Sequence, residues 1–294
     1  MGYKKPTLDE FLATLLDDVL TSNTFIDWER IKNFLEDYRR EIGLLGSLSK
    51  KEPLKDLEDL LLHYPRILEL LHHLIAHEPM RLNLLDIGNV DFKKDMERLK
   101  SGDTSTAKKL AEAFDKMGLI EEIVNMKSVF DFSKGVMVGL EPNKRKNRRG
   151  SIFQDKLLPE LIEKIIADFE ENEKLYLRRE GGVGMKILVG GREKYPDFGI
   201  FIKERPIAFI EVNFYAASGS KPEETLKGSY PDLQNNLEKK GINLIVITDG
   251  MGWRKMKNGL KVALERLNYL MNFTLAKKGK LKEALLDILN KSYV

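Results

Sequence analysis

Apolar residues recur at intervals of three and four through the first part of the chain, from residue 7 to about residue 128. This spacing places apolar side chains along one face of a helix. Prolines and the segment Ser101-Gly102-Asp103 interrupt the pattern and separate the helices. The predicted helices lie at residues 8–20, 28–42, 54–62, 67–75 and 107–117. No strand-like alternation occurs among them, so we predict an all-helical N-terminal region at residues 1–130.

The pattern changes near residue 131, beyond which strands and helices are mixed. Two segments rich in aromatic and β-branched residues, 196–203 and 207–215, predict a hairpin around the charged turn Lys203-Glu204-Arg205-Pro206. The continuous apolar run 243–248 predicts a strand covered on both faces. Helices are predicted at residues 151–171, 231–240, 258–273 and 280–290. Because a strand, helix, strand order implies a right-handed crossover, residues 131–294 predict an α/β core with a mixed central sheet flanked by helices.

Composition is that of an ordinary globular protein. The chain has 294 residues, of which 42% are hydrophobic, enough for a substantial core. It contains no cysteine, which excludes disulfides, cysteine nucleophiles and cysteine zinc sites. No apolar stretch reaches membrane-spanning length, and the N-terminal residues lack the apolar core of a signal peptide. We therefore expect a cytoplasmic protein with no membrane partner.

Positive charge is concentrated in one short stretch, although the net charge of the chain is only +3. The stretch consists of Lys144, Arg145, Lys146, Asn147, Arg148 and Arg149. Most charge runs are solvated loops, and a solvated loop is the alternative interpretation. The predicted capping box Ser151-x-x-Gln154 would open a helix directly after the run. A basic run before a helix N-terminus is suited to contacts with the phosphates of a polyanion.

The predicted hairpin brings polar side chains together on one face. A three-residue loop would place Asp197 opposite Glu211, and the two-residue period of a strand puts Asn213 on the same face. Hydrolysis of a phosphodiester needs an activated water, neutralised phosphoryl oxygens and a stabilised leaving alkoxide. Magnesium held by carboxylates supplies all three. We predict that Asp197, Glu211 and the backbone carbonyl of Val212 bind Mg²⁺.

The third position of this motif is unusual for a nuclease of the PD-(D/E)XK type, where a lysine is common. Here the residue is Asn213, whose amide carries no charge and cannot act as a general base. It could hydrogen-bond the water, the phosphate or a carboxylate that binds the metal. Lys221, in the polar segment that follows the second strand, is our candidate for returning a positive charge to the site.

Three sequence blocks, taken together, resemble the DpnII/MboI family of type II restriction endonucleases. They are GLEPNKRKNRRG at 139–150, IEVNFYAASGSKPEET at 210–225 and TDGMGW at 248–253, in the order expected for that family. The helical first part also resembles these enzymes, so the similarity covers most of the chain. The family pattern has Asp where this chain has Glu141. It also has Glu near the start of the core helix, where this chain has Gln154; Glu160 is a candidate to replace that carboxylate.

The resemblance implies an endonuclease fold of the PD-(D/E)XK type and Mg²⁺-dependent cleavage of double-stranded DNA at GATC, before the G, leaving 5′ overhangs. It implies that Asp197, Glu211 and Asn213 form the active site, that the basic run contacts DNA, and that a methyltransferase modifies adenine in the same sequence. Cutting both strands of a palindrome predicts a homodimer. The N-terminal helices would then serve dimerisation or embrace the DNA.

Two alternative functions remain open from the sequence. The first is a repair or defence nuclease on the same core that recognises DNA structure instead of sequence. The second is a DNA-binding protein whose catalytic carboxylates have decayed, which Gln154 and Asn213 would permit.

Overall fold

The computed structural model describes residues 2–169 and 174–292, which form two compact units. The unit that we call the sheet unit comprises Met1–Thr21 and Lys146–Val294, and the helical unit comprises Ser22–Arg145. Each unit has its own hydrophobic core. The boundary predicted after residue 130 differs from this division, because residues 2–21 return to the sheet unit and residues 131–145 belong to the helical unit.

The helical unit contains short amphipathic helices packed around Leu57, Leu61, Leu71 and Phe114, all of them buried. Its helices are α2 Ser22–Phe25, α3 Trp28–Asp37, α4 Arg39–Leu45, α5 Pro53–His63, α6 Ile67–Leu74, α7 Phe92–Lys100, α8 Thr104–Lys116, α9 Leu119–Asn125 and α10 Val129–Gly139. The all-helical prediction was wrong at one place, since β1 Arg81–Leu84 and β2 Gly88–Asp91 form an antiparallel hairpin. These strands are short and mostly exposed, so they leave no alternating apolar pattern in the sequence.

The basic run lies in a helix, not in a loop. Helix α11, Glu141–Ser151, continues through the π-helical segment Ile152–Leu157 into α12, Leu158–Ile166. Ser151 has helical dihedral angles, φ −61° and ψ −45°, and makes no side-chain cap. The predicted capping box at Ser151 was therefore wrong, because lysines and arginines are good helix formers and extend the helix ten residues further toward the N-terminus.

The sheet unit is built on a five-stranded mixed sheet of order β3-β6-β7-β8-β9. The strands are β3 Leu175–Arg179, β6 Phe198–Ile202, β7 Arg205–Phe214, β8 Asn243–Asp249 and β9 Tyr269–Met271. Neighbours from β3 to β7 are antiparallel, and β7, β8 and β9 are parallel, which confirms the predicted crossover into β8. The predicted helix 258–273 stops at Arg266, and the buried strand β9 follows it.

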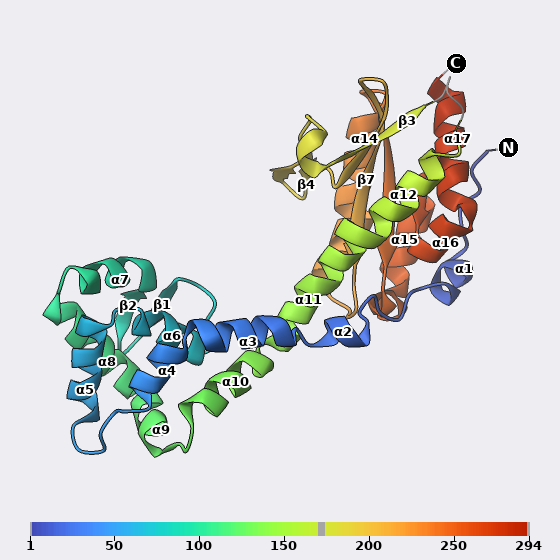
Figure 1. Ribbon diagram of the computed structural model, residues 1–294. Helices are drawn as coiled ribbons and strands as arrows, with labels where there is room; N and C mark the ends of the chain where they lie inside the picture. The colour runs from blue at the N-terminus through green and yellow to red at the C-terminus, as the bar shows by residue number, and fades with distance from the viewer. Residues whose placement is uncertain (1, 170–173, 293–294) are drawn as a thin grey trace. The chain divides into compact units, whose positions relative to one another are not determined.

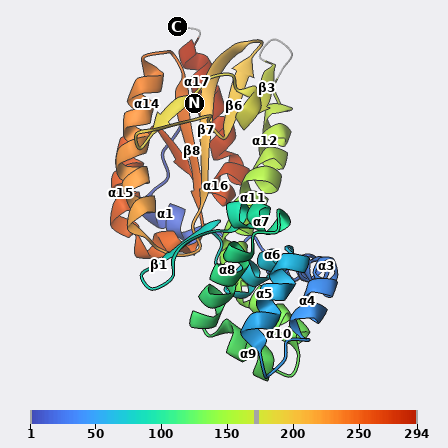
Figure 2. The same cartoon turned by 90° about the vertical axis from the view of Figure 1, so that its left-hand side faces the viewer.

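Helices cover both faces of this sheet. Figure 2 shows α14 Tyr230–Glu238 and α15 Lys257–Arg266 on one side of β7 and β8, with α12, α16 Phe273–Leu275 and α17 Leu281–Ser292 on the other. A separate hairpin of β4 Ile187–Val189 and β5 Arg192–Lys194 lies beside the sheet (Figure 1). The remaining helical elements are α1 Leu8–Ala13, α13 Ser220–Glu224 and the segments Glu180–Gly182, Thr225–Ser229, Met251–Lys255 and Ala276–Lys280. Among the described residues, none of the helices has the length and apolar character needed to cross a membrane.

Candidate active site

The register of the β6–β7 hairpin brings Asp197 and Glu211 together. Phe198 pairs with Ile210, so Asp197, one residue before Phe198, lies next to Glu211, one residue after Ile210. The joining turn is shorter than predicted, because Arg205 already belongs to β7. A register shift between Ile200 and Phe201 compensates for the shorter turn. The strand ends therefore meet in the predicted register, by a bulge and not by a three-residue loop.

The carboxylate of Asp197 is held by groups from three other elements. Its Oδ2 atom accepts a hydrogen bond from the backbone N–H of Val212 at 2.8 Å, and its Oδ1 atom accepts one from Nε2 of Gln154 at 3.1 Å. Nζ of Lys194 lies 3.4 Å from the same Oδ1 atom. The side chain is thereby fixed at the start of β6. The contact seen at Val212 involves its N–H, and metal binding by its carbonyl stays a prediction.

Glu211 is fully buried at the centre of the sheet and has one unsatisfied oxygen. Its Oε2 atom lies 2.9 Å from Nζ of Lys194 and accepts a hydrogen bond from the hydroxyl of Tyr230 at 3.3 Å. Its Oε1 atom is buried and has no hydrogen-bond partner in the described part of the chain. A buried anionic oxygen without a donor is costly, and a cation beside it would satisfy it.

Burial dominates the electrostatics of this pair of carboxylates. Burial, together with the charge of Asp197, raises the pKa of Glu211 to about 7. Burial also raises the pKa of Asp197, while the nearby Lys194 partly offsets the shift. For Lys194, burial alone would lower the pKa, but Glu211 and Asp197 raise it above its usual value. The site therefore favours a bound positive charge between the two carboxylates.

The donor set fits a divalent cation held by two protein carboxylates. Asp197 and Glu211 supply hard oxygen ligands, and the unsatisfied Oε1 atom of Glu211 supplies the free position. In residues 2–169 and 174–292, no group of three or more acidic or histidine side chains gathers around a common point. The protein would thus offer few ligands and leave room for water and phosphate oxygens, as Mg²⁺ prefers.

Both polar atoms of the Asn213 side-chain amide form hydrogen bonds. Its Oδ1 atom accepts a hydrogen bond from the hydroxyl of Tyr215 at 2.9 Å, and its Nδ2 atom donates to the hydroxyl of Tyr230 at 2.6 Å. Tyr230 in turn donates to Glu211. Asn213 therefore reaches the carboxylate through Tyr230, and its side chain supplies no charge to the site.

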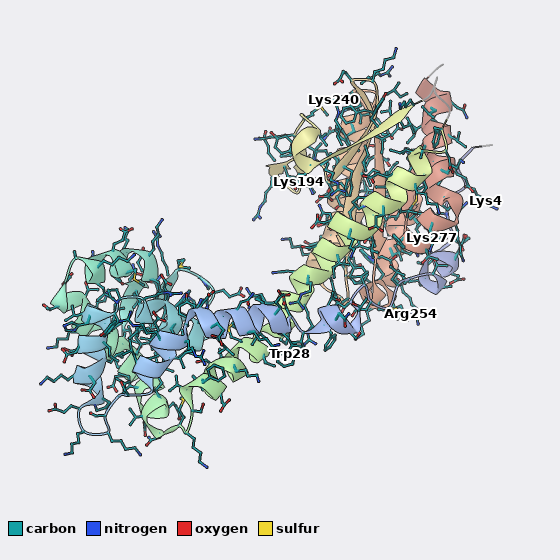
Figure 3. All side chains as sticks on the ribbon, in the orientation of Figure 1. Lys4, Trp28, Lys194, Lys240, Arg254 and Lys277 are labelled. Carbon is teal, nitrogen blue, oxygen red and sulfur yellow. The ribbon has the colours of Figure 1, made fainter. Side chains whose placement is uncertain are left out.

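The sequence analysis did not identify Tyr230, the hydrogen-bond donor to Glu211. Lys194 is the charged residue of this site that the sequence analysis missed. It lies at the end of β5, in the small hairpin beside the sheet, and Figure 3 labels it there. The only local signal is its position three residues before Asp197 in the segment Lys194-Tyr195-Pro196-Asp197. That spacing does not predict a contact, because only the β4–β5 hairpin brings the ammonium group back over the carboxylates.

A cavity of about 1010 Å³ opens beside Glu211 and Asn213. Basic side chains from several elements line it: Lys146, Arg149, Arg192, Lys194 and Lys221. Lys221, the cation predicted from the segment after β7, lies exposed in α13 at this cavity. A cavity with cationic walls and carboxylates at one side is suited to a phosphate backbone.

The six residues of the basic run point in different directions because they lie on a helix. Nζ of Lys144 is 3.0 Å from Oε1 of Glu78, and the guanidinium of Arg145 stacks over the ring of Phe25, both within the helical unit. Lys146 and Arg149 line the cavity. Arg149 also forms a bidentate ion pair with Asp18, from Nε to Oδ1 and from Nη2 to Oδ2. Asn147 is exposed, and Arg148 is partly buried with a partner of its own.

The block TDGMGW shapes the wall of the cavity. Asp249 is buried and accepts hydrogen bonds from the backbone N–H groups of Leu16, Gly250 and Phe273. A Cβ atom on Gly252 would lie 2.5 Å from the carbonyl oxygen of Ala217, so the backbones pack closer than any side chain allows. This contact positions the segment after β7 that lines the cavity.

Glu141 and Gln154, the two departures from the family pattern, have different roles. Glu141 is buried and accepts a hydrogen bond from Nη2 of Arg30 at 2.6 Å, so it anchors α3 within the helical unit. Gln154 holds Asp197 at the site. Glu160, the proposed substitute carboxylate, is exposed on α12.

Comparisons with known proteins identify relatives over almost the whole chain. A sequence model described as DpnII restriction endonuclease matches residues 7–283. The type II restriction enzyme MjaIII of Methanocaldococcus jannaschii is 29% identical over 93% of this chain and 97% of its own length. DpnII of Streptococcus pneumoniae is 27% identical over 90% of this chain and 93% of its own. MboI of Moraxella bovis is 27% identical over 91% of this chain and 92% of its own length. No solved structure matches the chain.

Proposed function

This chain belongs to the DpnII restriction endonuclease family, and we propose that it cuts double-stranded DNA at 5′-GATC-3′, before the G, with Mg²⁺ as cofactor and 5′ overhangs as product. The family makes it a type II restriction enzyme, a site-specific deoxyribonuclease. The choice of GATC rests on the three sequence blocks that resemble the DpnII/MboI enzymes.

The observation that carries the proposed chemistry is the buried Oε1 atom of Glu211, which has no hydrogen-bond partner among the described residues and lies beside the carboxylate of Asp197. Two carboxylates on adjacent strands, with a basic cavity beside Glu211, support a core of the PD-(D/E)XK type. Asp197 and Glu211 take the positions of its two acidic residues. Asn213 stands where the lysine would be.

In hydrolysis, a water oxygen attacks phosphorus, the bond from phosphorus to the leaving alkoxide breaks, and that oxygen is protonated. Magnesium, when bound, supplies Lewis acidity toward the phosphoryl oxygen and lowers the pKa of water. The hydrogen bonds from Val212 and Gln154 orient Asp197, and Tyr230 orients Glu211. Cationic side chains around the cavity, Lys221 among them, would neutralise the phosphate backbone.

The partners follow from the same proposal. Lys146 and Arg149 line the cavity and are the residues of the basic run best placed to contact DNA phosphates there. A palindromic target favours a homodimer, in which two copies of the site act on the two strands. We propose that the helical unit serves dimerisation or DNA contact, and that an adenine methyltransferase for GATC protects the host DNA.

The test is digestion of unmethylated and adenine-methylated plasmid by the purified protein, with Mg²⁺ or a chelator, followed by sequencing of the fragment ends. Cuts before the G of GATC, only with metal, are expected; the same digests measure how methylation affects cutting. Asp197→Ala should abolish cutting, whereas Asp232→Ala, an exposed residue on α14, should leave it unchanged. Cuts at another sequence would overturn GATC, and cuts set by DNA structure would favour the repair or defence nuclease. DNA binding without cutting under any metal condition would favour the decayed DNA-binding protein.

A further inference from the structure

The segment Glu211-Val212-Asn213 provides no cation for the scissile phosphate. Both ends of the Asn213 amide are bonded to tyrosine hydroxyls, so this residue cannot turn to a substrate without breaking two hydrogen bonds. The charge that a phosphoryl-transfer site needs must therefore come from another element.

Lys194 lies at the point where that charge is needed. Its Nζ atom is 2.9 Å from Oε2 of Glu211 and 3.4 Å from Oδ1 of Asp197. The same side chain lines the cavity and is 38% exposed, so it has a path from the carboxylates toward the cavity. Its flexible four-carbon stem permits such a movement.

The position of Lys194 also explains how the two carboxylates tolerate each other. Glu211 is fully buried and Asp197 is 9% exposed, and like charges this close destabilise one another unless a cation lies between them. A divalent cation held by Oε1 of Glu211 and the carboxylate of Asp197 would lie close to the ammonium group, which contacts Oε2 of Glu211 and Oδ1 of Asp197. The two cations repel each other, so each weakens the binding of the other at this pair of carboxylates.

We propose that Lys194 occupies the cation position between Asp197 and Glu211 in the metal-free chain, and that it moves to the scissile phosphate when a divalent cation takes over the carboxylates. This inference rests on the proposed function and adds to it a lysine from outside the strand that carries Glu211. Lys194 thus weakens metal binding by competition and supports cleavage by neutralising the phosphate.

The test compares Lys194→Met with the parent protein in two measurements. The first is Mg²⁺ binding without DNA, followed by titration calorimetry. The second is single-turnover cleavage of a GATC duplex at saturating Mg²⁺. We expect Lys194→Met to bind Mg²⁺ about tenfold more tightly and to cleave about 100-fold more slowly. A purely structural lysine would not give opposite effects on binding and cleavage.

Lys186→Met is the matched control, because Lys186 is exposed in the chain segment before β4 and pairs with Glu193. It should bind metal and cleave like the parent. Lys194→Gln repeats the test if the methionine variant unfolds, as judged by its melting temperature. Unchanged or weaker Mg²⁺ binding, or cleavage at the parental rate, would overturn the proposal for Lys194. If the parent cuts no DNA, the proposed function fails, while the binding comparison still decides whether Lys194 competes with metal.

Discussion

The side-chain nitrogen of Asn213 lies 2.6 Å from the hydroxyl oxygen of Tyr230, and that hydroxyl donates to Glu211. Tyr230 is almost completely buried, at 3% exposure, whereas Asn213 is half-buried at the cavity wall. This short chain of hydrogen bonds links the third position of the strand motif to the buried carboxylate without supplying charge. In this fold the side chain of Asn213 is therefore linked to Glu211 through Tyr230.

Tyr230→Phe removes the hydroxyl from the middle of this chain. It leaves Asn213 without its acceptor and Glu211 with one hydrogen bond fewer, which costs about 1–2 kcal/mol in the free energy of unfolding. We expect cleavage to slow about tenfold, since Glu211 is less well oriented. Denaturant unfolding and single-turnover kinetics measure the two effects. Tyr176→Phe, at a half-exposed site on β3, is the control, and equal behaviour of the two variants would contradict the prediction.

Gly252→Ala introduces a side chain where the backbone of Ala217 leaves no space. The new Cβ atom would lie 2.5 Å from that carbonyl oxygen and 2.7 Å from that of Tyr215, so the cavity wall must shift. We expect a loss of about 1–3 kcal/mol in unfolding free energy, together with weaker cleavage. Gly228→Ala has open space around its new Cβ atom and should be neutral or stabilising. Equal melting temperatures for Gly252→Ala and Gly228→Ala would contradict this prediction.

Glu211 should make the metal-free protein less stable as pH rises. The pKa of its carboxyl is raised from 4.5 to about 7 in the folded chain, so between these values the folded state binds more protons than the unfolded state. Stability therefore falls between about pH 4.5 and pH 7, and above that range the loss from this group is complete. In chelator, Glu211→Gln should show a smaller fall in melting temperature across this range. Glu160→Gln, at an exposed position, should follow the parental profile.

Lys221→Ala removes one cation from the wall of the cavity. Fewer phosphate contacts should weaken DNA binding and reduce the slope of log K against log salt by about one. We expect cleavage at subsaturating DNA to fall about tenfold. Lys261→Ala, at an exposed position on α15, has the same change in charge and should have neither effect. If Lys221→Ala cleaves DNA at the parental rate and shows the parental salt slope, Lys221 does not contact the DNA backbone.

Local sequence patterns predicted the features that depend on neighbouring residues. The two-residue period of β6 and β7 predicted that Asp197 and Glu211 meet, and the apolar run 243–248 predicted the buried parallel strand β8. Strand periodicity and burial can be predicted from the sequence because both depend on the order of polar and apolar residues over a few consecutive positions. The three sequence blocks indicated the family for the same reason, since each is a short continuous stretch.

The groups that complete the site come from distant parts of the chain and are brought together by folding. Gln154, 43 residues earlier in the chain, reaches Asp197 from the π-helical segment. Tyr230 reaches Glu211 from α14, and Lys194 reaches both carboxylates from a separate hairpin. The basic run lies within α11 and not before a helix N-terminus at Ser151, because α11 continues through the π-helical segment into α12. These contacts depend on how whole elements pack against the sheet. No local period encodes that packing, so the cation beside the two carboxylates became visible only in the folded chain.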